Sequence, residues 1–539
     1  NNMLELTGAA TAVLDLGSVG ATGNLQGFAN LAKSGAGVWT LTGNGAALSG
    51  GVTVEAGKLI VNGTLAASSS LTVMSGGTLG GSGVVPTTIV NGGTLSPGNS
   101  PGTLTVNGNL SLSTGSTYVA EIQGSVSDRV NVSGTASLAG TLRLVPLGGS
   151  YAFNNPYTLL SAAGGTSGTF SPVDTSGSFG AGVTTAVSYT ANDVLLTLRP
   201  KPLGAMGSSN ATSIASAIDA IVANGGDPSS LFGIYNLPAG SISAAVNSLS
   251  GEVHSAAPAM ATAAADQFLH AMLDPTAAGR LAGLGAPGPG TAAFSGLVRK
   301  GVDSPQQPSR LDAPLYSVWG SAFGSRGRTD GSAAIGSARG TLDDAHLAAG
   351  VDLRLLPGTV AGLAVSGGKA RASLPGLLGK VDADVFQAGL YGTTQLGAVK
   401  LGGALGYARL DNDVRRGIPA LGSSLSSSYA TTAWSGRLQA SAALLGMNGF
   451  ILSPLAAIQA TWAHSPAVVE ANWAGANAGA LALAKRDDVT SRSEVGAQID
   501  ADTVIAGVAV TGYVRAAWAH YFQRDAGLTA SLLGLPGAS

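Results

Sequence analysis

The sequence predicts an all-β dominated protein in which a parallel β-solenoid, a short α-helical linker and an antiparallel transmembrane β-barrel follow one another. Its 539 residues include 81 glycines and 23 prolines, which disfavour long regular helices. Only 10% of the residues are charged although 45% are hydrophobic, so neither disorder nor an ordinary charged surface fits. The hydrophobic residues fall in short runs, none of which reaches the ~18 residues of a membrane helix.

Charge and cysteine content exclude several classes of function. The net charge of -2 provides no basic surface, which argues against nucleic acid as a partner. Cysteine is absent, so disulfide frameworks, thiolate metal sites and cysteine nucleophiles are excluded. The chain begins Asn1-Asn2-Met3 without a signal sequence, and we expect it to be either mature or a piece of a longer protein.

Residues 1–199 contain short β-prone runs separated by Asn-Gly and Gly-Gly turns. The segments at residues 54–59, 73–79 and 90–95 share a pattern in which valine opens the segment and leucine closes it. Their closing leucines lie roughly 16 to 20 residues apart, which suits one rung of a parallel solenoid. A β-sandwich of short strands is the alternative.

Residues 200–314 are rich in alanine and have a helical period. A first helix is predicted from the N-cap Asn210 to the Asn-Gly-Gly stop at residues 224–226, and a second over residues 256–273. The following run of glycine and proline at residues 283–290 predicts a tether without a core of its own.

Residues 315–539 alternate between polar and apolar positions over long segments. Arg437 and Glu494 lie on the polar parity of their segments, whereas Trp434 and Leu438 lie on the apolar parity. Because a strand alternates faces, this pattern predicts a charged, wet lumen and a neutral wall that faces lipid. A soluble barrel with apolar residues inside would show similar alternation and remains the alternative.

About nine membrane strands are predicted in this region. Their predicted starts lie near residues 316, 341, 358, 383, 397, 429, 450, 489 and 504. Aromatic residues near the predicted strand ends would form the girdles at the membrane surfaces. These residues are Trp319, Trp434, Trp462, Trp518, Tyr407 and Phe450.

An ordered set of motifs along the chain resembles the monomeric autotransporters of Gram-negative bacteria, the type V secretion route. LAKSGAGVWTLTGN followed by LSGGVTV, at residues 31–54, is similar to their passenger-associated repeat. Further similar motifs are LSPGNSPGTL at 95–104, YTLL at 157–160, LSGEVH at 249–254, VWGSAFG at 318–324 and AWAH at 517–520.

The resemblance implies three domains. Residues 1–199 would be the C-terminal part of a right-handed β-helical passenger with its autochaperone, residues 200–314 a linker with a helix in the lumen, and residues 315–539 the translocator barrel. The protein would insert in outer-membrane lipid as a monomer, with the barrel-assembly machinery and periplasmic chaperones as partners, and move its own passenger to the cell surface. The alternative function is a surface adhesin that binds host or bacterial surfaces.

The chain also departs from the family. Autotransporter barrels have twelve strands and end in an alternating strand with a terminal aromatic residue, whereas this sequence offers about nine candidates and ends at Ser539. We therefore expect a fragment that lacks its last strands, is shortened at the N-terminus as well, and does not close a pore.

Two segments match motifs of enzymes but lack a feature that the chemistry of each motif requires. Gly98-Asn99-Ser100-Pro101-Gly102 matches the nucleophile elbow, but Pro101 lacks the N–H that the oxyanion hole requires. The GLGAPG run at residues 283–288 resembles a dinucleotide loop, but no strand precedes it. The sequence therefore predicts no catalytic and no cofactor-binding residues, and a protein that is not an enzyme.

Histidines and acidic residues are the remaining candidates for a chemical site. The five histidines lie too far apart in sequence for a local metal motif, so no metal site is predicted; they are His254, His270, His346, His464 and His520. Acidic residues of a lumen could cleave the linker, as the resemblance implies for some members, but no spacing selects among the candidates. These candidates are Asp384, Glu494, Asp500 and Asp502.

Overall fold

The computed structural model describes residues 2–205, 209–274, 315–332, 337–447, 450–473, 477–505, 508–524 and 527–535. The chain divides into two compact units. The first comprises residues 1–204 and 218–243, and the second comprises residues 205–217 and 244–539.

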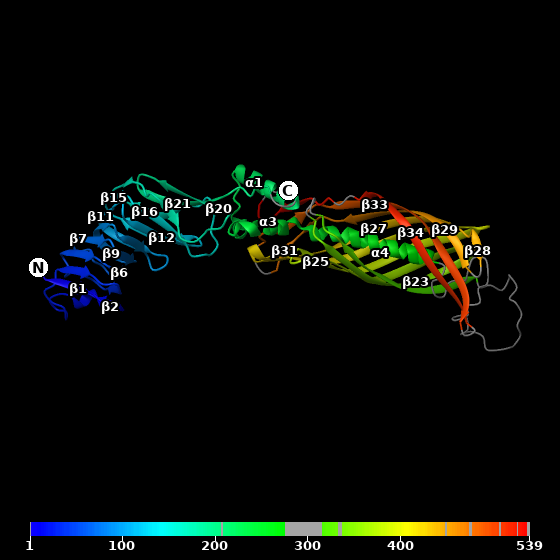
Figure 1. The fold of residues 1–539 in the computed structure, drawn as a ribbon, viewed down its shortest axis with the longest axis horizontal. Coiled ribbons are helices and arrows are strands. Elements are labelled where there is room, and N and C mark those ends of the chain that lie inside the picture. The colour runs from blue at the N-terminus through cyan, green and yellow to red at the C-terminus, as the bar shows by residue number, and fades with distance from the viewer. Residues whose placement is uncertain are drawn as a thin grey trace. The chain divides into compact units, whose positions relative to one another are not determined.

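The first unit is a solenoid in which successive strands alternate between two sheets (Figure 1). One sheet runs in the order β1 (Met3–Leu6), β3 (Asn30–Lys33), β5 (Gly51–Val54), β7 (Ser70–Met74), β9 (Val84–Asn91), β11 (Thr103–Leu112), β14 (Arg129–Val132), β17 (Tyr157–Ala162), β21 (Asp193–Pro200) and β20 (Val183–Tyr189), with β15 (Ala136–Leu138) and β18 (Thr166–Gly168) at its side. The other runs β19 (Val173–Thr175), β16 (Thr141–Pro146), β12 (Thr117–Gln123), β10 (Thr94–Pro97), β8 (Gly77–Gly81), β6 (Gly57–Val61), β4 (Val38–Thr42) and β2 (Thr11–Asp15), with β13 (Val126–Ser127) beside β12.

Ladders of identical side chains explain why the repeats fold in this way. Leu59 of β6 pairs with Leu79 of β8, and Leu79 pairs with Leu95 of β10, all in parallel register and fully buried. Val73 and Val90 form an equivalent ladder in the other sheet. Each rung therefore buries its apolar face against its neighbours. The parallel pairing confirms the predicted solenoid and rules out the β-sandwich alternative.

The solenoid ends in antiparallel pairing and an aromatic cluster. β17 and β20 both pair antiparallel with β21, which breaks the parallel stacking. The ring of Phe232 packs 4.9 Å from Phe153 and 5.3 Å from Tyr151, between ring centroids. This cluster covers the last rung with aromatic side chains and gives the stack a closed end.

One buried carboxylate organises the turn that follows β10. Asp128 is fully buried, and its two oxygens accept hydrogen bonds from the backbone N–H groups of Gly102 at 2.8 Å and Glu121 at 3.0 Å. Burial disfavours its charged form and raises its pKa to about 6, although the two backbone donors oppose the shift.

The solenoid should therefore become more stable as the pH falls from 7 to 5. An aspartate with a pKa raised above that of the unfolded chain binds its proton first in the folded state, so its stabilising contribution is complete below pH ~4 and lost above pH ~6. We expect protection from hydrogen exchange, corrected for intrinsic rates, to rise by about 1 kcal/mol in peptides around Gly102 and Glu121. Asp128→Asn should remove this pH dependence, and an equal dependence in the variant would contradict the assignment.

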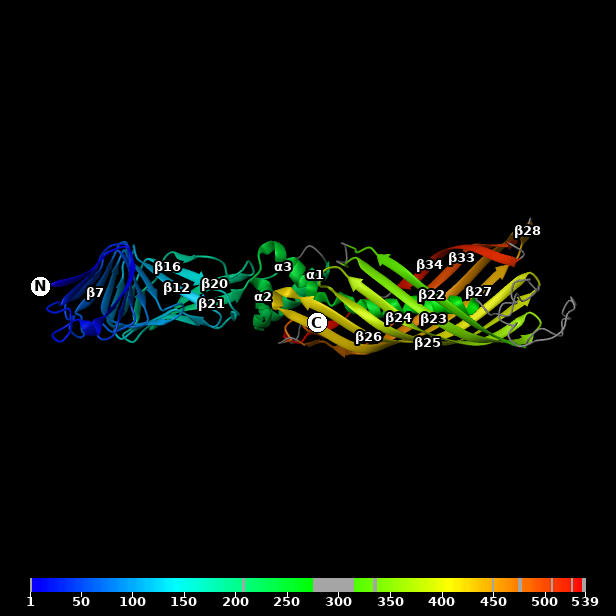
Figure 2. The same ribbon diagram turned by 90° about the horizontal axis from the view of Figure 1, so that it is seen from below.

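The second unit contains a curved antiparallel sheet, here called the barrel sheet (Figure 2). Among the described residues its main path is β22 (Tyr316–Thr329), β23 (Gly340–Leu356), β24 (Thr359–Leu374), β25 (Gly379–Leu396), β26 (Val399–Ile418), β27 (Ser423–Ala442), β29 (Phe450–Ser465), β33 (Arg486–Ile505) and β34 (Val508–Arg524). β28 (Leu445–Met447) and β31 (Ala471–Asn472) pair at its margins, and β30 (Val468–Val469), β32 (Leu481–Leu483) and β35 (Ala530–Leu532) form a small separate sheet. The nine long strands confirm the predicted strand number.

The helices are short apart from two. They are α1 (Ser209–Ala223), α2 (Phe232–Tyr235), α3 (Ala239–Asn247) and α4 (Ala256–Leu273), with 3-10 turns η1 (Leu16–Ser18), η2 (Ser229–Leu231), η3 (Ser248–Ser250), η4 (Glu252–Ser255) and η6 (Pro419–Leu421). The predicted bounds of α4 are confirmed, whereas Asn210 lies inside α1 and does not cap it. The predicted tether at residues 283–290 lies outside the described residues. No helix in the described part of the chain is long and apolar enough to span a membrane.

Candidate functional site

Helix α4 lies inside the curve of the barrel sheet and packs against its inner face (Figures 1 and 2). Near its start, Met260 and Ala264 join a buried cluster with Val385 and Leu410 of the wall. Near its end, Phe268 joins a second buried cluster that includes Met272, Trp319, Ala364 and Tyr391. Seven of its first ten residues are alanine, and such small side chains let the helix approach the wall closely.

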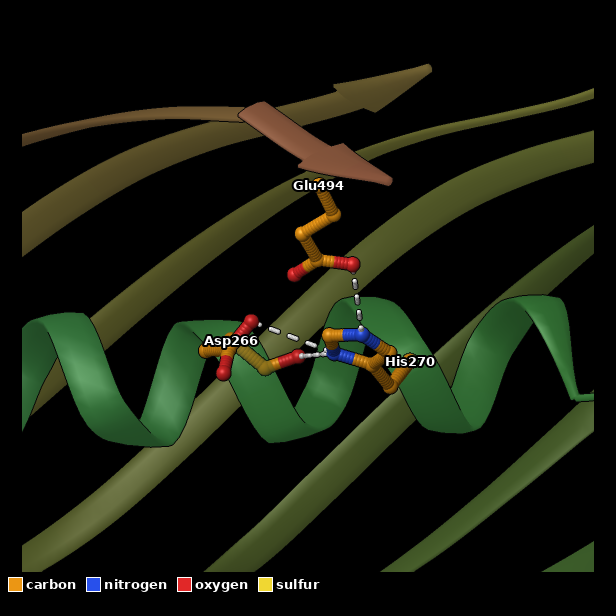
Figure 3. A group of neighbouring side chains, drawn as sticks. All are labelled: Asp266, His270 and Glu494. Atoms are coloured by element: carbon orange, nitrogen blue, oxygen red, sulfur yellow. Dashed lines mark hydrogen bonds and ion pairs between the residues drawn. The ribbon is translucent and has the colours of Figure 1, made fainter. Parts of the chain in front are cut away.

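Polar side chains of α4 meet a carboxylate of β33 at the middle of the wall (Figure 3). Asp266 and His270 are one turn apart on α4, and His270 Nδ1 lies 3.1 Å from Asp266 Oδ1. His270 Nε2 lies 3.8 Å from Glu494 Oε2. The three residues offer ligand atoms that all lie within 4.8 Å of one another, which is the spacing of a candidate metal site.

Three arginines of the barrel sheet surround this group. Arg437 donates to Glu494 at 2.6 Å, and Arg492 pairs with the other oxygen of Glu494 at 2.7 Å and also with Asp266. Arg515 lies 3.6 Å from Glu494. Three guanidinium groups against two carboxylates leave a net positive charge, which opposes a divalent cation. The group therefore acts as a set of ion pairs between helix and wall, here called the helix lock (Asp266, His270, Arg437, Arg492 and Glu494).

Removing Arg492 from the helix lock should loosen α4. Arg492→Met deprives Asp266 of its guanidinium partner in a partly buried site, and we expect a loss of roughly 2 to 4 kcal/mol. Hydrogen exchange of α4 amides should report it, whereas Arg371→Met in an exposed pair should change it little. Zinc should not raise the melting temperature of the wild-type chain, and a zinc-dependent rise would show instead that the group holds a metal.

A second buried network joins the chain just before α4 to strand β26 and to one connection of the barrel sheet. Glu470 pairs with Arg416 at 2.6 Å and with His254 of η4 at 2.9 Å, and its carboxylate also accepts the backbone N–H of Leu481. Arg416 donates further to the carbonyl oxygens of Ser248 and Gly479. This set of side chains, here called the mouth network (His254, Arg416 and Glu470), ties the chain that precedes α4 to the connection between β29 and β33.

A third set of contacts lies beside the C-terminal end of α4. The indole Nε1 of Trp319 donates to the hydroxyl of Tyr391 at 2.6 Å, and that hydroxyl in turn donates to Asp352. A Cβ added at Gly350 would lie 2.4 Å from the Trp319 ring, so only glycine leaves room for this indole. Trp319 is 1% exposed, and its predicted place in an outer aromatic girdle is therefore wrong.

The connections between strands define the two ends of the barrel sheet. Connections of two residues at 357–358 and 397–398 lie at the end where Leu273 packs beside Gly402. Longer connections at 330–339 and 466–485 lie at the opposite end, where Ala338 donates to Glu252 of η4. Outer-membrane barrels have short periplasmic turns and longer extracellular loops, so η4 marks the extracellular end.

The outer face of the barrel sheet changes from apolar to charged along its strands. Leu363, Leu390 and Leu405 form an exposed apolar row across β24, β25 and β26. Towards the longer connections the same face carries exposed ion pairs such as Lys369 with Asp384. β26 has 20 residues, about twice the ~9 to 11 that cross a membrane, so the strands extend beyond the lipid.

The structure separates the four acidic candidates. Asp384 is exposed on the outer face, so its predicted lumenal position is wrong. The reason is that the strands are longer than the membrane is thick, and the part of a strand outside the lipid contacts water on both faces. Glu494 lies in the helix lock, and Asp500 accepts a hydrogen bond from Gln498. The side chain of Asp502 lies outside the described residues. Cleavage of the linker by acidic residues stays a prediction.

The histidines are brought to different places. His254 belongs to the mouth network and His270 to the helix lock, while His346 is buried against the ring of Phe323. His464 pairs with Asp487 in an exposed position, and His520 stacks on Trp518. Sequence reasoning missed the helix lock, although the spacing of Asp266 and His270 by four residues was a signal for one helix face.

An antiparallel barrel sheet with an apolar outer belt, a polar inner face and a helix locked inside it defines a translocator domain of the outer membrane. Residues 318–539 match the family model of the autotransporter beta-domain. Residues 318–539 therefore form an autotransporter beta-domain, and domains of this family lie in the outer membrane and export a passenger to the cell surface.

Two solved structures are similar to this chain. The translocator domain of the autotransporter NalP from Neisseria meningitidis has 14% sequence identity and a TM-score of 0.35, covering 42% of this chain and 74% of its own. The beta domain of the Bordetella autotransporter Brka has 17% identity and a TM-score of 0.32, covering 40% of this chain and 82% of its own. None of the curated proteins matches the chain.

Proposed function

We propose that the barrel sheet of residues 315–539 belongs to a closed barrel that exports the solenoid of residues 1–199, and that α4, within the linker of residues 200–314, remains in the lumen afterwards. The observation that supports this direction is the position of η4 at the end with the longer connections. The chain that precedes α4 leaves the lumen at that extracellular end. The helix lock and the mouth network then hold α4 where the exported chain has passed.

The composition of the solenoid provides a source of energy for export. Each completed rung buries leucine and valine side chains, at about 25 cal/mol per Å² of apolar surface. Leu79 and Leu95 are fully buried only when neighbouring rungs are in place. Folding outside the cell therefore opposes return through the lumen, without any nucleotide.

The partners follow from this location. We propose the barrel-assembly machinery and periplasmic chaperones as transient partners, in addition to outer-membrane lipid. We propose that the passenger segment of this chain turns over no substrate. The adhesin alternative stays a prediction, and adherence of the purified chain to host or bacterial cells would support it.

Protease treatment of intact cells that express the gene tests the proposed export. Trypsin should cleave the solenoid at exposed basic residues such as Arg143, because these lie outside the cell. Peptides of β23 to β27 should stay protected until the outer membrane is disrupted. Cleavage of the solenoid only after permeabilisation would contradict the proposal.

A further inference from the structure

A row of polar side chains interrupts the apolar contact between α4 and the barrel sheet. Ser366 of β24 and Gln387 of β25 are direct cross-strand partners on the inner face. Ala348 lies opposite Ser366 on β23, and Ala408 lies opposite Gln387 on β26. The apolar cluster around Met260 lies on one side of this row along the strands, and the cluster around Phe268 lies on the other.

These polar side chains are buried without hydrogen-bond partners in the protein. Gln387 is 0% exposed and Ser366 is 4% exposed. Neither amide atom of Gln387 nor the hydroxyl of Ser366 has a partner among the described residues. Buried polar groups in proteins are nearly always hydrogen-bonded, because an unpaired group loses its hydration without compensation. We therefore expect a ligand that forms hydrogen bonds with these side chains.

Two further side chains extend the row towards the extracellular end and the helix. His346 of β23 is buried, and its Nε2 lies 3.3 Å from Asp344 Oδ2 without the alignment of a hydrogen bond. Asp344 is already satisfied by the backbone N–H and hydroxyl of Ser325 and by Gln267 of α4. The remaining amide oxygen of Gln267 has no partner in the described structure.

The row contains both hydrogen-bond donors and acceptors, and this mixture indicates which kind of ligand can bind. The Gln387 amide nitrogen and one imidazole nitrogen of His346 carry N–H groups that would repel a cation, while the Gln387 and Gln267 oxygens would repel an anion. Water both donates and accepts, and buried waters typically make about three hydrogen bonds to such groups. We propose that Gln267, His346, Ser366 and Gln387 bind a small cluster of ordered water molecules between α4 and the wall.

This hydration site changes what holds the helix. Between the two apolar clusters, α4 rests against a hydrated strip in place of a continuous hydrophobic surface. Water-mediated bonds fix the polar groups while allowing rearrangement at little cost. The inference concerns the inner wall alone and does not depend on which segment of the chain is exported.

A high-resolution crystal structure of the purified chain, grown in the presence of thallium(I), tests the proposal. We expect density within hydrogen-bonding distance of Ser366 Oγ and both amide atoms of Gln387, without an anomalous signal. An anomalous peak at this position would show a cation site and overturn the proposal. A direct hydrogen bond between Ser366 and Gln387, with no further density, would overturn it as well.

The substitution Gln387→Leu provides an independent measurement. If the amide is truly unpaired and dry, its removal should raise the melting temperature of the barrel sheet, because a desolvated polar group disappears. If water satisfies it, the melting temperature should stay the same or fall. Gln395→Leu on the same strand, where Nε2 bonds to the Gly397 carbonyl near the short turn, is the matched control. A rise specific to Gln387→Leu overturns the proposal.

Discussion

Replacing Leu79 by aspartate should abolish display of the solenoid at the cell surface while leaving insertion of the barrel unchanged. Leu79 is 0% exposed and pairs with Leu59 and Leu95 in adjacent rungs. The substitution removes a leucine from the core and buries a carboxylate without a partner, which together cost more than about 5 kcal/mol. A rung that cannot close also cannot template the next one, so the loss spreads along the stack. Leu95→Asp should behave in the same way.

The measurement is surface labelling of the solenoid on intact cells, with barrel insertion followed separately by the heat-modifiable mobility of the outer-membrane fraction. Ile89→Asp is the matched control, because Ile89 is 42% exposed on β9 of the same solenoid and its replacement buries no charge. The control should be displayed normally. Unchanged display of Leu79→Asp, or an equal loss of display in the control, would show that export does not depend on the folding of the rungs and would contradict the prediction.

Replacing Arg416 by methionine should open the mouth network. Arg416 and Glu470 are nearly fully buried, and their pair is joined by two hydrogen bonds at 2.6 and 2.7 Å. Removing the guanidinium leaves the buried Glu470 with only His254 and the backbone N–H of Leu481 as described partners, and breaking such a pair typically costs about 3 to 5 kcal/mol. We expect faster hydrogen exchange in η4 and in the connection at residues 466–485, and a lower melting temperature.

The double variant Arg416→Met with Glu470→Met controls for the loss of the pair as such. It removes both charges, and similar exchanges of buried ion pairs for apolar residues are often neutral or stabilising. The double variant should therefore recover most of the stability. Lys369→Met in the exposed pair with Asp384 should change stability by less than about 1 kcal/mol. A double variant as unstable as the single one would refute the role of the buried charge.

Much of the fold follows from local patterns. The valine and leucine repeats predicted the rungs around Leu59, Leu79 and Leu95, because a parallel stack places identical positions in register. The alternation of polar and apolar residues predicted the nine long strands, and the stop at Asp274 predicted the end of α4. Periodicity suffices for these elements because the repeat of polar and apolar residues alone determines which face of the helix or strand each side chain lies on.

The side-chain sites could not be predicted in the same way. Trp319 was expected in an outer girdle, yet it lies on the inner face of its strand together with Ser317 and Ser321, where Gly350 leaves space for its ring. Asp384 shares the parity of other charges, but its strand extends beyond the lipid, so its outer face is wet. The domain bounds at residues 199 and 314 and the absence of catalytic, cofactor and metal residues stay predictions.

The sequence by itself determined the order of solenoid, helix and barrel sheet, because composition and period act within a few neighbouring residues. Only the tertiary structure decided which charges meet. Asp266 and Glu494 are far apart in the chain, and their shared partner Arg492 depends on the register of β33 and on the rotation of α4 within the wall. That register and rotation are set by the packing of many strands at once, and no local pattern encodes them.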